Sequence, residues 1–324
     1  MFRVRGNMLA ALLRCFLISI AVPIIVACNS KPENENASLQ KAPLPPTAAP
    51  ESAKYPDPET TFREFEKAET TLNFAADLLT RVNRLALKYG SDARYGDAEE
   101  LLKRLIVFCQ NPKVNDLRQL AATENNLALL YMREKKYGKA EPLLQKSLVL
   151  QQSLLAKDDP EFAAGINNLA TLYYEQARYK DALPLFERAR QIYSLKTEKN
   201  LDALSKTLNN LAACYSNLGK IETAEKILEE ALALEQRSPQ STKSTLAAAL
   251  NNLGYIYEIQ AKYEKAEPLL SKGLSLAESA YGSDSIELVS FLDNQAYLLR
   301  KTNRKEQALQ CKKRAQNILL AHNR

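Results

Sequence analysis

The chain has 324 residues, of which 46% are apolar and 25% charged, the balance of a folded protein with one large or two ordinary domains. The formal charge of +6, part of which comes from three arginines near the N-terminus, is too mild to indicate a nucleic-acid partner. Because His322 is the single histidine and none of the nine glycines forms GxGxxG or a phosphate-binding loop, most histidine-based catalysis, His-rich metal sites and nucleotide-binding motifs are excluded.

Residues 1–27 predict an export signal. Arg3 and Arg5 precede the almost wholly apolar run Cys15 to Ala27, which is shorter than the roughly 20 residues that span a bilayer. The segment Ile25-Val26-Ala27-Cys28 resembles a bacterial lipobox, in which the signal is cut before the cysteine and that cysteine receives the lipids. This resemblance implies lipidation of Cys28. The alternative is an uncleaved N-terminal anchor.

Residues 28–57 predict a linker that begins at the lipidated Cys28. Six prolines lie among Asn, Ala, Glu and Ser, namely Pro32, Pro43, Pro45, Pro46, Pro50 and Pro56. Such a stretch cannot bury a core, and in extended form, at about 3.1 Å per residue, it could hold the folded part up to roughly 90 Å from the membrane. Asn29 replaces the Asp that usually retains lipoproteins at the inner membrane, so the resemblance implies the periplasmic face of the outer membrane.

Residues 58–324 predict a repeat domain. The sequence Asn125-Asn126-Leu127-Ala128 recurs at steps of 42 residues without an insertion. The six units begin their pair at Asn83, Asn125, Asn167, Asn209, Asn251 and Asp293. Their bounds are about 74–115, 116–157, 158–199, 200–241, 242–283 and 284–324. The helical pattern from residue 58 to residue 89 is longer than other first helices, so an extra capping helix is expected before the first unit.

Each unit predicts two helices joined by a short turn. Small residues at the Ala128 and Ala140 columns let the two helices approach closely, and the Tyr131 column fills the space beside them. Three prolines are expected in the first turn of the second helix, where no internal N–H bond is lost: Pro142, Pro184 and Pro268. The last helix, Lys305 to Ala321, is more polar than its equivalents and predicts a cap.

This succession of Leu, Ala or Gly, Tyr, Ala, a large apolar residue and Ala resembles the tetratricopeptide repeat. The period of 42 with NNLA and AEPLL is similar to the kinesin light chain subtype. The resemblance covers residues 74 to 322. It implies an all-α fold, a right-handed superhelical solenoid of helix-turn-helix repeats, whose first helices line a concave groove.

The same resemblance implies a peptide-binding groove along the first helices. Amides offer donors and an acceptor to an extended backbone, and tyrosines add apolar area with a polar tip. The predicted groove residues are Asn83, Asn125, Asn167, Asn209, Asn251, Asp293, Tyr174, Tyr255 and Tyr297. The second asparagine of each pair lies a further 100° round the helix, where we expect it to satisfy a backbone group of a neighbouring helix or loop.

Two of the cysteines predict core positions. Cys214 and Cys311 occupy columns that hold Leu or Ile in other units, and free cysteine acts as a small hydrophobe. They lie more than two repeats apart, so no intramolecular disulfide is expected between them. The place of Cys109 is left open.

Three functions compete at this point. The first is a membrane-tethered scaffold that binds an extended peptide or partner protein in the groove, in a bacterial envelope assembly. The second is a self-associating structural component of such an assembly. The third is an enzyme, for which Glu175 with Glu258 is a weak carboxylate pair. The sequence favours the scaffold, with other proteins and the membrane as partners, and no cofactor, metal, nucleic acid or small-molecule substrate.

Overall fold

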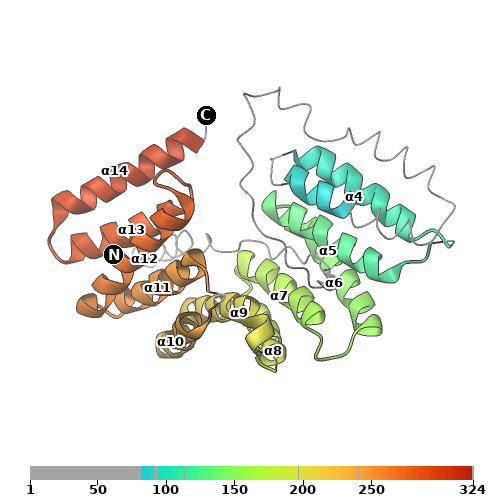
Figure 1. The fold of residues 1–324 in the computed structure, drawn as a ribbon, viewed down its shortest axis with the longest axis horizontal. Helices are drawn as coiled ribbons and strands as arrows, with labels where there is room; N and C mark the ends of the chain where they lie inside the picture. Colours follow the sequence, from blue (N-terminus) through green and yellow to red (C-terminus); the bar gives the residue numbers. More distant parts are fainter. Residues whose placement is uncertain (1–81, 91–93, 113, 196, 240, 323–324) are drawn as a thin grey trace, which may run out of the picture. The chain divides into compact units, whose positions relative to one another are not determined.

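The computed structural model describes residues 82–90, 94–112, 114–195, 197–239 and 241–322 (Figure 1). Throughout these ranges the regular secondary structure is helical, which confirms the predicted all-α class. Cys28, the leader, the linker and the capping helix expected before the first repeat lie outside the described residues. The chain divides into two compact units, one ending at Leu154 and the other continuing from Leu155.

The unit that ends at Leu154 consists of stacked helices. Residues 82–90 are helical, and they are followed by α4 (Tyr95–Cys109), α5 (Leu117–Arg133) and α6 (Tyr137–Leu154). Helix α5 packs against both α4 and α6. One face of α4 packs into this core. Its leucines, at three or four residue spacing, are at most 1% exposed: Leu101, Leu102 and Leu105.

The unit that begins at Leu155 consists of four further helix pairs. They are α7 (Pro160–Glu175) and α8 (Tyr179–Ser194), α9 (Thr197–Asn217) and α10 (Ile221–Arg237), α11 (Lys243–Ile259) and α12 (Tyr263–Tyr281), and α13 (Leu288–Lys301) and α14 (Lys305–His322). Each helix packs on the next, and the first helices α7, α9, α11 and α13 also contact one another in that order. Helical pairs in contact only with their neighbours are the arrangement of a repeat solenoid.

The turn inside each pair has one repeated backbone conformation. Its central residue has a positive φ of 57° to 76° at Lys135, Ala177, Gly219, Ala261 and Asn303. The following N–H bonds to the carbonyl group five residues earlier, as from Arg178 to Tyr173 at 2.8 Å. Only one of the five residues is glycine, so the others carry a left-handed conformation that costs about 1–2 kcal/mol. Closure of the turn by these hydrogen bonds offsets that cost.

The expectation for the helical prolines is wrong by one turn. Helices α6, α8 and α12 begin at Tyr137, Tyr179 and Tyr263, so each proline is the sixth residue of its helix. A proline there removes one N–H bond to the carbonyl group four residues earlier. Those carbonyl groups belong to Gly138, Lys180 and Glu264, which are exposed. Water can therefore satisfy them, and the helices continue through the proline.

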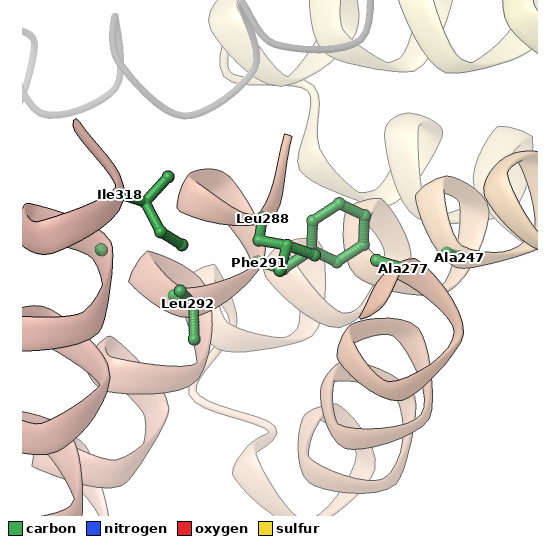
Figure 2. Packing of buried hydrophobic residues seen from close by; sticks show 7 residues of the cluster. Ala247, Ala277, Leu288, Phe291, Leu292 and Ile318 are labelled. Carbon is green, nitrogen blue, oxygen red and sulfur yellow. The ribbon is translucent and has the colours of Figure 1, made fainter. Parts of the chain in front are cut away.

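The last two repeats share an apolar cluster that closes the unit. Figure 2 shows the ring of Phe291 pointing toward Ala277 of α12, while Leu292 lies beside Ile318 of α14. Phe291 is 3% exposed and Leu288 is fully buried. Ala247 of α11 completes the contact. Because α11, α12, α13 and α14 all contribute side chains, the cluster holds the terminal helix pair to the preceding one.

The three described cysteines are free thiols. Cys214 is fully buried in α9, as predicted for a core thiol, and Cys109 is fully buried in α4. Burial raises the pKa of each to about 12, so neither is a nucleophilic thiolate near neutral pH. Cys311 is only half-buried and packs against the apolar cluster of the last two repeats.

Candidate functional site

Three of the second asparagines, Asn126, Asn252 and Asn294, fasten their repeat to the preceding one. Their side-chain Nδ2 donates to the Oδ1 of the preceding repeat's first asparagine. The pairs are Asn126 to Asn83 at 3.1 Å, Asn252 to Asn209 at 2.8 Å and Asn294 to Asn251 at 3.1 Å. For these three residues the partner is a side chain, whereas the sequence predicts a backbone group. Satisfied amides explain why two poor helix formers persist inside buried helices.

The first asparagines are buried. Their exposed fractions are 7% for Asn83, 6% for Asn125, 4% for Asn167, 8% for Asn209 and 1% for Asn251. The Oδ1 of Asn167 accepts a hydrogen bond from Thr207 Oγ1 at 3.1 Å, so four of these carbonyl oxygens have described partners in the next repeat. Contact between the first asparagines and a ligand stays a prediction.

The hydrogen bond between Asn252 and Asn209 is expected to couple two repeats energetically. Replacing either residue by alanine leaves one buried polar atom of the other, Asn209 Oδ1 or Asn252 Nδ2, without this partner and should lower the free energy of unfolding by about 1–3 kcal/mol. The double variant should cost less than the sum of the single variants by roughly 1 kcal/mol. Urea denaturation of the four proteins measures this. A control cycle between Asn252 and Asn126, whose hydrogen bonds go to different partners, should be additive, and additivity in both cycles would contradict the fastening role.

Asp293, in the last repeat, has a different kind of partner from the first asparagines. It occupies the first-asparagine column of the last repeat, and its Oδ1 forms an ion pair with Lys312 Nζ at 2.5 Å. Lys312 replaces a leucine that is buried in the preceding repeat, Leu270. A charged pair therefore stands at a position where another repeat would otherwise dock. A role for Asp293 in ligand binding stays a prediction.

The predicted tyrosines lie half-buried on the side formed by the first helices α7, α11 and α13. We use "first-helix face" for Thr171, Tyr174, Ala213, Ser216, Tyr255, Glu258 and Tyr297, which share two columns of the repeat at i, i+3 spacing. Tyr174 Oη accepts a hydrogen bond from Asn217 Nδ2 of α9 at 3.2 Å, and burial raises the Tyr174 pKa. This bond connects Tyr174 to the next repeat.

Tyr255 and Tyr297 extend this face toward the C-terminus. Burial raises the pKa of Tyr255 to about 12, with smaller contributions from the charges of Glu258 and Tyr297. Arg300 and Lys301 place their cationic groups 5.7 Å and 5.4 Å from the centre of the Tyr297 ring. The Tyr297 ring is therefore already in cation–π contact from its own helix.

Glu258 is the most unusual group of the first-helix face. It is 2% exposed, and neither carboxylate oxygen has a side-chain hydrogen-bond partner within the described residues; only the backbone of Leu298 in α13 lies close enough to favour the ionised form. Burial raises its pKa to about 8. One repeat earlier in the same column, Ser216 is 5% exposed and its Oγ also lacks a described partner. Two buried polar groups of one column are thus unsatisfied, which is rare in native proteins.

A column of basic residues, which the sequence patterns above do not include, keeps the same step of 42. Its members are Arg94, Lys136, Arg178, Lys220, Lys262 and Arg304. Each follows the turn, and most lie over a tyrosine ring of the same repeat, as Arg178 lies over Tyr173 at 4.0 Å. The tyrosine hydroxyl can bond the preceding repeat, as Tyr215 Oη donates to Glu187 Oε1 at 2.8 Å. This column therefore stabilises the stack.

Within the described residues, no group of three or more His, Cys, Asp or Glu side chains is placed to hold a metal ion. None of the described helices is both long enough and apolar enough to cross a membrane.

Comparison with known proteins identifies the repeat. The family model described as "Tetratricopeptide repeat" matches residues 119–195, 162–237, 202–274 and 245–321, together more than half of the chain. No curated protein matches the chain.

Solved structures share the fold. BtubC (BKLC) from P. vanneervenii is 25% identical with a TM-score of 0.55, over 76% of this chain and 92% of that one. The repeats of a putative kinesin light chain from Podosopora anserina are 21% identical with a TM-score of 0.54, over 62% of this chain and 95% of theirs. NprR in complex with its cognate peptide NprX is 17% identical with a TM-score of 0.57, over 80% of this chain and 73% of that one.

Proposed function

This chain belongs to the tetratricopeptide repeat family, and we propose that it is a membrane-tethered scaffold whose first-helix face binds an extended segment of a partner protein. The observation that supports this most is the set of three half-buried tyrosines, Tyr174, Tyr255 and Tyr297, on first helices of one compact unit. Tyrosine combines large apolar area with a polar tip and few rotatable bonds, which is why it dominates many binding surfaces.

The first asparagines have a secondary place in this proposal. With at most 8% of each residue exposed, they offer a ligand only the edge of an amide. Their alanine variants would also remove hydrogen bonds between repeats, so lost binding in such variants could follow from lost stability. The tyrosines are the better residues to test because their rings are partly accessible.

A triple variant, Tyr174→Ala, Tyr255→Ala and Tyr297→Ala, is expected to lose its partner. Quantitative mass spectrometry of proteins retained by the purified chain, against envelope extract from its own organism, should show at least one protein depleted about tenfold or more relative to wild type. The control variant replaces exposed residues of the second helices, Lys226→Ala and Lys272→Ala, and should retain that protein. Equal retention by the tyrosine variant would contradict the first-helix face as the binding surface.

The membrane tether is proposed from the sequence around Cys28. Several acyl chains on one residue give stable anchoring, whereas a single chain binds marginally. We expect Cys28→Ala to block signal cleavage and lipid addition, so that metabolic labelling with radioactive palmitate no longer marks the protein. Cys109→Ala, which removes a buried thiol of α4, is the matched control and should keep the label. Palmitate incorporation into the Cys28 variant would contradict the lipoprotein proposal.

Self-association is the alternative, and α14 supplies the observation that favours it. Three leucines of this terminal helix are unusually accessible: Leu309 is 56% exposed, Leu319 41% and Leu320 63%. Exposed apolar side chains at the end of a solenoid can join it to another copy. Sedimentation equilibrium at high concentration separates the two proposals, since a monomer would argue against self-association.

A further inference from the structure

We propose that the buried Glu258 carboxylate is a subsite for a cationic side chain, lysine or arginine, of the bound partner segment. The inference rests on the proposed function, since it assigns a chemical class to one part of the same ligand. It starts from a carboxylate that is 2% exposed and has no side-chain hydrogen-bond partner within the described residues, where the weak contribution of the Leu298 backbone does not offset burial. Burying such a group without a partner is costly, and a cation that reaches it repays the cost.

Comparison with another buried glutamate shows what a purely structural one looks like here. Glu235 of α10 is also 2% exposed, but its Oε2 accepts hydrogen bonds from Ser241 Oγ at 2.5 Å and Thr245 Oγ1 at 2.7 Å. The chain thus supplies hydroxyl groups where a glutamate stabilises the fold. Around Glu258 no described side chain does this, and only the Leu298 backbone favours its charged form.

The repeat itself does not require an acid at this position. The equivalent residues are Gly90, Met132, Tyr174, Ser216 and Arg300, five residues of different chemistry. Because the side chain at this position differs between repeats whose helices pack alike, the solenoid fold does not require a particular residue there. Glu258 is therefore a particular property of the repeat that contains α11, and a specific ligand contact explains it.

The surroundings of Glu258 suit a cation on a long stem. Tyr255 lies one turn before Glu258 on α11 and on the same face as Tyr297 of α13. The charges of Glu258 and Tyr297 both raise the pKa of Tyr255. Tyrosine rings accept both the aliphatic stem and the cationic head of lysine or arginine, as Arg300 and Lys301 already demonstrate on the Tyr297 ring. The unsatisfied Ser216 Oγ on the adjacent helix α9 offers a further acceptor.

Binding of a cation at a carboxylate that is 2% exposed requires side chains of the first-helix face to move. Tyr255 and Tyr297 are half-buried, and rotamer changes of partly exposed side chains are fast compared with peptide binding. Burial raises the Glu258 pKa to about 8. A bound cation would favour the ionised form of the carboxylate.

The test uses fluorescein-labelled hexapeptide pools whose fixed central residue is lysine, arginine, norleucine or citrulline and whose other positions carry mixtures of uncharged residues. Fluorescence anisotropy with the purified full chain at neutral pH measures the affinity of each pool. We expect the lysine and arginine pools to bind about tenfold tighter than the norleucine and citrulline pools. In E258Q that preference should disappear, while the affinity of the norleucine pool stays within about twofold.

The matched control is E124Q. Glu124 is 4% exposed on the first helix α5, has one carboxylate oxygen without a described partner, and lies outside the first-helix face. This variant should keep the preference for cations. If wild type binds all pools equally, or if the preference survives in E258Q, the cationic subsite is wrong and the scaffold proposal stands. If wild type binds none of the pools, both proposals are overturned.

Discussion

Glu258→Gln is expected to flatten the dependence of stability on pH. In the folded chain the Glu258 pKa is raised from 4.5 to about 8, because burial disfavours the charged form. Between these values the native state keeps a proton that the unfolded state has released. Stability contributed by this site therefore falls as the pH rises from about 4.5 to about 8. A shift of this size corresponds to an upper limit on the order of 5 kcal/mol.

Glutamine imitates the neutral acid and cannot ionise. Urea denaturation of wild type and E258Q at half-unit pH intervals should give free energies of unfolding whose difference grows in favour of the variant above about pH 5 and levels off above about pH 8. Because other groups titrate equally in both proteins, the difference isolates Glu258. Parallel pH profiles of the two proteins would show that the carboxyl group is solvated or paired in solution.

Phe291→Ala is expected to unfold the end of the array. The ring is 3% exposed in the cluster shared by α11, α12, α13 and α14 (Figure 2), and removing a buried phenylalanine ring costs about 3–5 kcal/mol. In a solenoid, each pair is stabilised chiefly by its neighbour. Hydrogen exchange should therefore show lost protection of backbone amides in α13 and α14, with smaller changes in α7 to α10.

The control for this prediction is Leu309→Ala. Leu309 belongs to the same terminal helix pair but is 56% exposed, so its loss should change the free energy of unfolding by no more than about 0.5 kcal/mol. Uniform loss of protection over all described helices in the Phe291 variant would mean that the repeats unfold as a single cooperative body.

The fold was largely predictable because its signal is repetition. The column of Asn125 and the small-residue columns of Ala128 and Ala140 recur at one step, and each recurrence is an independent measurement of the same helix pair. Helix starts were less predictable. The sequence predicts Pro142 in the first turn of its helix, where proline removes no internal hydrogen bond. Helix α6 instead begins one turn earlier, at Tyr137.

The candidate site was only partly predictable. A helical wheel places Asn125 and Asn126 on adjacent faces, but it cannot show that an amide of one repeat lies within hydrogen-bonding distance of an amide of another, as Asn126 does with Asn83. The burial of the first asparagines follows from this stacking. The sequence presents Glu258 only as half of a weak carboxylate pair with Glu175. Its lack of a side-chain hydrogen-bond partner depends on the three-dimensional packing of its neighbours, which the sequence alone does not show.

Site-specific photo-crosslinking in living cells tests the central claim most directly. A benzoylphenylalanine residue in place of Tyr255, on the first-helix face, and one in place of the exposed Lys272 of α12 compare two sides of the same repeat. The account predicts one discrete crosslinked partner protein from position 255, absent from position 272 and suppressed by Tyr174→Ala and Tyr297→Ala. Crosslinks to a partner from position 272 alone would contradict it, since the second helices would then be the binding surface.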